Sequence, residues 1–127
     1  MDLAIVCVGL LGLLVMGLGL RVSLLRGSTS QTIGYKDDPA DELYKWVRAH
    51  ANACEYAPML AILIFALAST GFRGWGGSLY IAAVAVRYAH AAGMVLSPTL
   101  AKGHPLRFGG ALGTYVVGFL LVFAAIF

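Results

Sequence analysis

The stretch that decides the fold is residues 48–68, R-A-H-A-N-A-C-E-Y-A-P-M-L-A-I-L-I-F-A-L-A. Residues 57–68 are wholly apolar, whereas the part before them carries Arg48, Asn52 and Glu55. These three stand at positions i, i+4 and i+7, a spacing that stacks side chains on one face of an α-helix. The stretch therefore predicts a helix in which a polar stripe leads into a segment suited to lipid.

The composition of the chain agrees with a membrane environment. Of 127 residues, 60% are hydrophobic and 12% are charged, whereas soluble domains carry about 25% charged residues. We therefore expect one all-α integral membrane domain over residues 1–127. The net charge is +3, but no basic cluster with interleaved aromatics occurs, so we expect no nucleic-acid partner. Cys7 and Cys54 are isolated and show no metal-ligand spacing, so neither a disulfide framework nor a metal site is expected.

Four apolar segments are long enough to cross a bilayer, whose core requires about 20 helical residues. The expected spans are residues 3–25, 47–70, 79–97 and 106–126. We expect the first span to remain attached, because no basic residue precedes it and no A-x-A cleavage motif follows it. Four spans predict an up-down-up-down helix bundle.

The basic residues predict the orientation of this bundle. The first and third loops and the adjacent helix ends carry five of them, Arg26, Lys36, Lys45, Lys102 and Arg107. The second loop and the termini carry only Arg73. By the positive-inside rule, the first and third loops are expected in the cytoplasm.

Capping residues and proline predict the course of the second helix. Asp38 followed by Pro39 is typical of an N-cap and a first helical residue, so this helix is expected to begin in water. Pro58 lacks a backbone donor and predicts either a kink just beyond Glu55 or the boundary between two helices.

Small residues at four-residue spacing predict where helices pack closely. The second span carries one such series, Ala49, Ala53, Ala57 and Ala61. The fourth span carries Gly109 and Gly113 in GxxxG spacing. Close helix contacts are expected at both places.

Glu55 and Arg87 are expected at similar depth on antiparallel helices, roughly 10–15 Å into the membrane at 1.5 Å per residue. An unpaired charge at the bilayer centre costs roughly 2.5–3.5 kcal/mol, so we predict an ion pair between them. Arg21 closes the first span and Arg107 opens the fourth, both on the same side. The sequence therefore predicts a cavity in which several arginines bind a small anion or dianion.

Other roles remain open for these charged residues. Basic residues near helix ends commonly extend toward lipid headgroups, which is the simpler interpretation of Arg21, Arg26 and Lys102. Polar or ionisable groups within spans indicate function, which applies to Arg48, Asn52, Glu55 and Arg87. A purely structural polar network between helices is the alternative for this second group.

Simpler roles are also open for five further residues. His50 and His90 are more often hydrogen-bonded residues of a bundle than ligands or bases. Tyr56 and Tyr88 are candidates for packing or for anchoring at the membrane surface. Cys54 is more often a small buried hydrophobe than a nucleophile.

Residues 48–58, R-A-H-A-N-A-C-E-Y-A-P, resemble the second-helix signature of the MAPEG family, the membrane-associated proteins of eicosanoid and glutathione metabolism. Residues 87–90, R-Y-A-H, resemble its third-helix motif. Arg107, ahead of a glycine-rich span, resembles the fourth-helix arginine of the family. The resemblance covers nearly the whole chain and is that of a bacterial-type member.

This resemblance implies a homotrimer of four-helix protomers that binds glutathione between neighbouring subunits on the cytoplasmic side. The residues it implies in glutathione binding are Arg48, His50, Asn52, Glu55, Tyr56, Arg87 and His90. It further implies that Arg107 stabilises the glutathione thiolate. The implied function is a glutathione-dependent transferase or peroxidase acting on a hydrophobic small-molecule electrophile in the lipid bilayer.

Two features depart from the family pattern. Met94 stands where several glutathione-binding members have a tyrosine, and the third loop is longer than in the animal enzymes, so Lys102 is an alternative to Arg107. The family also includes a non-enzymatic lipid-binding member. A non-catalytic lipid- or partner-binding protein is therefore the alternative function, and a small transporter or channel subunit is a third.

Overall fold

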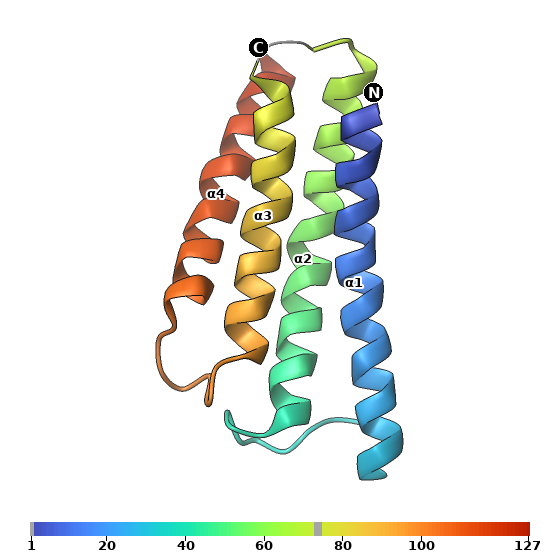
Figure 1. The fold of residues 1–127 in the computed structure, drawn as a ribbon, viewed down its shortest axis with the longest axis vertical. Helices are drawn as coiled ribbons and strands as arrows, with labels where there is room; N and C mark the ends of the chain where they lie inside the picture. The colour runs from blue at the N-terminus through green and yellow to red at the C-terminus, as the bar shows by residue number, and fades with distance from the viewer. Residues whose placement is uncertain (1, 73–74) are drawn as a thin grey trace.

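The computed structural model describes residues 2–72 and 75–127 (Figure 1). It contains four helices: α1 (Asp2–Thr29), α2 (Glu42–Ser69), α3 (Gly76–Val95) and α4 (Pro105–Ile126). Figure 1 shows them side by side, with the loops after α1 and α3 at one end of the molecule and both chain termini at the other. The described residues contain no strand. The predicted all-α four-helix bundle is confirmed.

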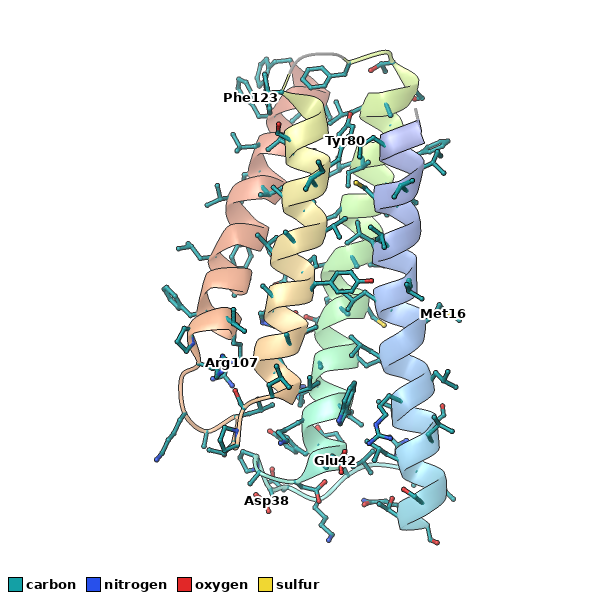
Figure 2. All side chains as sticks on the ribbon, in the orientation of Figure 1. Met16, Asp38, Glu42, Tyr80, Arg107 and Phe123 are labelled. Carbon is teal, nitrogen blue, oxygen red and sulfur yellow. The ribbon has the colours of Figure 1, made fainter. Side chains whose placement is uncertain are left out.

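Each helix is long and apolar enough to cross a membrane. Large hydrophobic side chains also cover the outside of the bundle: Met16 is 74% exposed and Phe119 is 72% exposed. Figure 2 shows Met16 at the outer edge of the bundle. Lipid accommodates such a surface, whereas water does not. The chain is therefore an integral, multi-pass membrane protein.

The first turn of α2 is capped by Asp41, so the predicted cap at Asp38 is wrong. The Asp41 carboxylate accepts a hydrogen bond from the N–H of Tyr44 at 3.0 Å. Asp38 instead closes a turn ahead of the helix, in which its side chain accepts from the N–H of Ala40 at 2.9 Å. The four residues D-P-A-D form a local turn. The helix therefore begins about one helical turn later than predicted.

α2 continues through Pro58 as one helix of 28 residues, so Pro58 does not divide two helices. At 1.5 Å per residue, α2 is about 42 Å long, which exceeds the roughly 30 Å hydrocarbon core of a bilayer. Three residues of the predicted small-residue face, Ala49, Ala53 and Ala57, are at most 1% exposed, whereas the fourth, Ala61, is only partly buried. They pack into two hydrophobic clusters with residues of α1 and α3.

Glycines bring the backbones of α3 and α4 into contact. A methyl group added at Gly110 would lie 2.5 Å from the backbone nitrogen of His90, and one added at Gly113 would lie 2.5 Å from the Val86 side chain. The predicted pair of Gly109 and Gly113 is thus half correct, because the space beside Gly109 is open. Successive residues point about 100° apart around a helix, so only one of the adjacent Gly109 and Gly110 can face α3.

These two adjacent glycines provide a matched pair for a stability test. Gly110→Ala is expected to destabilise the protein by about 1–3 kcal/mol, because the added methyl forces α3 and α4 apart. Gly109→Ala is expected to be neutral or slightly stabilising, since alanine favours a helix by up to about 1 kcal/mol over glycine. Thermal unfolding in detergent measures both. Equal stability of the two variants would contradict the close contact.

Candidate functional site

Arg87, in the middle of α3, is the centre of a polar cluster inside the bundle. Its side chain is only 1% exposed. Its Nη2 donates to Asn52 Oδ1 of α2 at 2.6 Å, and its Nη1 donates to Thr114 Oγ1 of α4 at 3.2 Å. The guanidinium carbon lies 5.3 Å from the centre of the Tyr56 ring, within the range of a cation–π contact. One side chain thus joins three helices.

Hydroxyl groups on α4 complete this cluster. Thr114 donates to the carbonyl oxygen of Gly110 at 2.7 Å, which orients its oxygen as an acceptor for Arg87. The hydroxyl groups of Tyr56 and Tyr115 lie 2.8 Å apart, and their rings meet edge to face. A cavity of about 30 Å³ lies among these groups. Its lining residues are Asn52, Tyr56, Arg87, His90, Ala111, Thr114 and Tyr115.

An apolar groove of about 140 Å³ adjoins the cavity and runs between α2 and α4. Tyr56, Thr114 and Tyr115 border both spaces, and the rest of the groove is lined by side chains such as Met59 and Phe119. A polar site buried in the bundle is therefore continuous with an apolar surface at membrane depth.

The predicted ion pair between Glu55 and Arg87 is wrong. Within residues 2–72 and 75–127, the one ion pair joins Arg21 and Glu42 at 2.8 Å. The reason is rotation around α2. At 100° per residue, Glu55 lies about 60° to one side of Asn52 and Tyr56 about 40° to the other. Asn52 and Tyr56 consequently face Arg87, and Glu55 is exposed on the surface of the protomer.

The seven predicted glutathione-binding residues fall into three groups. Four of them, Asn52, Tyr56, Arg87 and His90, line the cavity beside Arg87. Arg48 and Glu55 form an exposed outward stripe on α2. His50 faces α1: a methyl group at Gly19 would lie 3.0 Å from its Nε2, and Cys54 Sγ lies 3.4 Å from the same nitrogen.

His90 is 6% exposed and packs where α3 meets Gly110 of α4. Among the described residues its Nδ1 has no hydrogen-bond partner. Both the cavity lining and this unpaired nitrogen distinguish His90 from a side chain that is only packed. It remains, with Arg87, on the cavity side of the helix.

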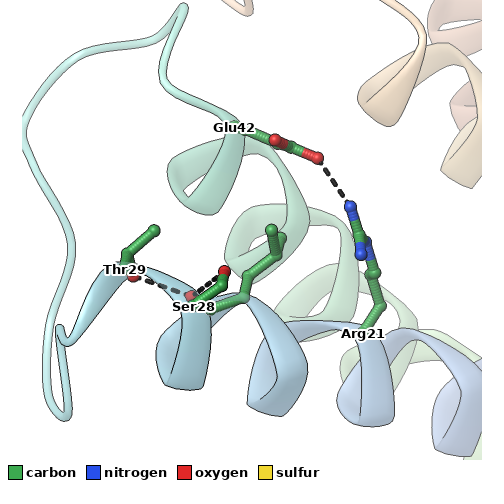
Figure 3. A network of polar contacts seen from close by, with 5 residues as sticks. Arg21, Ser28, Thr29 and Glu42 are labelled. Atoms are coloured by element: carbon green, nitrogen blue, oxygen red, sulfur yellow. Dashed lines mark hydrogen bonds and ion pairs between the residues drawn. The ribbon is translucent and has the colours of Figure 1, made fainter.

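The predicted gathering of arginines in one cavity is also wrong within the protomer. Arg107 donates to the carbonyl oxygens of Leu100 at 3.1 Å and Lys102 at 2.8 Å, which closes the third loop onto the start of α4 (Figure 2). Arg21 pairs with Glu42, close to the bonds that Ser28 and Thr29 donate to the backbone of α1 (Figure 3). These guanidinium groups find nearer acceptors than a shared anion.

The two loops at this end are joined to each other. The N–H of Leu100 donates to the carbonyl oxygen of Pro39 at 2.9 Å, and Lys45 Nζ donates to the carbonyl oxygen of Ser97 at 3.0 Å. The first and third loops thus form one layer. Arg107 is held at the edge of this layer, partly buried.

Thr114 and Tyr115 are residues of the candidate site that the sequence analysis missed. They are the only hydroxyl-bearing residues in α4, whose other side chains are mostly apolar. An inventory of polar groups in every apolar span, and not only of charged ones, would have found them. Their partners on α2 and α3 could not be assigned from spacing along one helix.

Four membrane-spanning helices around a buried arginine cluster define a multi-pass membrane protein with a polar site inside its bundle. A family model, that of the MAPEG family, matches residues 4–127, and the chain belongs to this family. Its members are glutathione-related transferases and peroxidases or proteins of lipid metabolism. No individual curated protein gives a significant match to the chain.

The bond between Arg87 and Thr114 can be tested with an isosteric change. Thr114→Val removes the hydroxyl and leaves a buried N–H of Arg87 unpaired, so a loss of about 1–3 kcal/mol of stability is expected. Thr114→Ser keeps the hydroxyl and should lose much less. Unfolding of both variants in detergent gives the comparison. A valine variant as stable as the serine variant would show that this hydrogen bond contributes nothing.

Proposed function

We propose that the protein is a glutathione-dependent membrane transferase or peroxidase that works as a homotrimer on hydrophobic electrophiles in the bilayer. The observation that carries this proposal is the outward stripe of α2. Arg48 and Glu55 are exposed on the surface of the protomer, in a helix suited to a membrane. A charge facing hydrocarbon costs roughly 2.5–3.5 kcal/mol, so this face favours a polar ligand or a neighbouring protomer over lipid.

The outward stripe matches the charges of glutathione, a tripeptide with two carboxylates, one ammonium group and a thiol. The Arg48 guanidinium suits a carboxylate, because its planar N–H groups bind two oxygens at once. Glu55 suits the ammonium group. Because both side chains face away from their own bundle, the glutathione site lies between neighbouring subunits of the proposed trimer.

The first and third loops are placed in the cytoplasm in this proposal, following the distribution of basic residues. Glutathione enters from that side. The electrophile enters from the lipid, along the apolar groove between α2 and α4. Tyr56 and Tyr115 mark the point where the apolar groove meets the polar cavity.

The reaction needs a thiolate. A cysteine thiol has a pKa of about 8.5 and is mostly protonated at neutral pH, and an adjacent guanidinium lowers this pKa by favouring the anion. Arg107 is the proposed partner: an arginine carries five N–H donors, and its two bonds to loop carbonyls leave others free.

In the transferase reaction, the thiolate sulfur bonds to the electrophilic carbon, and the bond to the leaving group breaks with its electron pair. In the peroxidase reaction, the thiolate sulfur bonds to the terminal oxygen of a hydroperoxide and the O–O bond breaks, which gives glutathione sulfenic acid and an alkoxide that takes up a proton to become an alcohol. The thiol of a second glutathione then attacks the sulfenic sulfur, which forms glutathione disulfide and releases water.

A non-catalytic lipid- or partner-binding membrane protein is the second candidate. The hydrogen bonds of Arg87 to α2 and α4 favour it, because they give the polar cluster a structural role without any chemistry. In that case a lipid occupies the groove, and the outward stripe of α2 serves assembly alone.

Thiolate formation tests the catalytic role of Arg107. Ultraviolet difference spectra of the purified protein with glutathione are expected to show a thiolate signal at neutral pH. Arg107→Ala should abolish this signal. Lys102→Ala is the matched control, because it removes a neighbouring exposed cation, and it should retain the signal. The reverse result would transfer the role to Lys102. Absence of glutathione binding in both detergent and lipid would overturn the proposed function.

The outward stripe is tested by binding. Arg48→Ala is expected to weaken glutathione binding by roughly 10- to 150-fold, the equivalent of losing a charged hydrogen bond of about 1.5–3 kcal/mol. Calorimetry with glutathione measures this. Lys36→Ala removes one positive charge from the first loop and should bind as the wild type does. If Arg48→Ala changes subunit assembly or lipid retention and the wild type binds no glutathione, the second candidate holds.

A further inference from the structure

Arg87 is a buried cation whose direct contacts are with neutral groups. Within the described residues it bonds to an amide oxygen and a hydroxyl oxygen and lies against an aromatic ring, and it forms no ion pair. The acidic residue nearest to it along α2, Glu55, faces outward. An uncompensated charge in a protein interior is strongly destabilising, because attraction to water is lost and no opposite charge replaces it.

Several hydrogen-bond donors around the cavity of about 30 Å³ beside Arg87 are left without an acceptor. The Nε–H of Arg87 has no acceptor among the described atoms. Asn52 uses its carbonyl oxygen to accept from Arg87, which leaves the N–H groups of its amide available. In the hydrogen bond between Tyr56 and Tyr115, one hydroxyl donates and the other accepts. The O–H of the accepting hydroxyl is therefore free to donate to a ligand.

Two of the acceptors that line the cavity are already bonded to Arg87, and the His90 Nδ1 beside them has no partner among the described residues. Thr114 accepts from Arg87 and donates to the carbonyl oxygen of Gly110. The Asn52 oxygen is taken by Arg87 at 2.6 Å. A ligand that satisfies the free donors must therefore supply lone pairs, and a ligand that balances Arg87 must be negative.

Size limits this ligand further. A cavity of about 30 Å³ holds one or two water-sized species and has no room for a tripeptide. We propose that it binds one small monovalent anion of about the size of chloride, held by Arg87, Asn52 and a tyrosine hydroxyl. The site lies between α2, α3 and α4 of one protomer, so it goes beyond the proposed glutathione site on the outward stripe and does not depend on it.

The bound anion balances the guanidinium charge and joins three helices. Its binding consequently stabilises the folded bundle by RT ln(1 + c/Kd), where c is the anion concentration, so the stabilisation grows with the logarithm of this concentration once it exceeds the dissociation constant. The same chemistry could come from a carboxylate group of glutathione reaching inward. A free halide and a carboxylate are distinguished by testing each alone.

The experiment follows the thermal stability of the purified full chain in uncharged detergent. Chloride replaces gluconate at constant ionic strength, which removes general screening effects. A rise in Tm that grows with the logarithm of the chloride concentration is expected, and bromide should act similarly. Arg26→Gln removes an arginine that bonds to the carbonyl oxygens of Gln31 and Gly34, and it should keep the chloride response.

Asn52→Asp is the decisive variant, because it places a carboxylate of the same shape against Arg87. It is expected to lose the chloride response and to show a raised Tm in gluconate, since the ion pair replaces the bound anion. Arg87→Gln should also lose the response. If Arg87→Gln does not fold, Asn52→Asp carries the test alone.

Equal Tm values in chloride and gluconate would overturn the proposal, as would an unchanged chloride response in Asn52→Asp. Stabilisation by glutathione without any by chloride would also overturn it, because the cavity would then serve a carboxylate of that molecule. Failure of glutathione to bind, with the chloride response intact, would contradict only the proposed function.

Discussion

Burial of Arg87 constrains how three of the four helices can be placed. Its guanidinium group must find acceptors inside the bundle, and it takes one from α2 and one from α4. Both must come within hydrogen-bonding distance of a side chain on α3, which requires the helices to lie close together. Gly110 allows this on the α4 side, because its backbone packs directly against His90. The polar cluster and the small-residue contacts are therefore one structural unit.

The two polar faces of α2 have different consequences. Asn52 and Tyr56 are used within the protomer, whereas Arg48 and Glu55 are exposed outside it. A soluble protein would solvate the second pair, but a helix in a membrane must cover it with a ligand, a lipid headgroup or a neighbouring subunit. The polar groups of α2 that still need a partner are thus on the outer surface of the bundle. The MAPEG family, to which the chain belongs, includes glutathione-related enzymes.

Arg21, Arg26 and Arg107 act locally at the loop end of the bundle. Arg107 holds the third loop, Arg26 holds the first, and Arg21 joins α1 to α2 through Glu42. Each guanidinium binds the nearest oxygen, because a nearby carbonyl or carboxylate costs less conformational entropy to reach than a distant shared site. Hydrogen bonds thus hold the loops together at this end of the molecule. Arg107 uses two of its N–H donors in these bonds and keeps the others free.

The sequence by itself determined that the chain is a four-span helical membrane protein of the MAPEG family, because the length of apolar runs and the spacing of motif residues are properties of consecutive residues. Only the tertiary structure decided that Arg87 bonds to Asn52 and Thr114 and not to Glu55, and that Gly110 and not Gly109 meets α3. A rotation of about 60° around α2 separates Asn52 from Glu55, and one of about 100° around α4 separates Gly110 from Gly109. That rotation is set by the packing of all four helices together, which no spacing along one helix records.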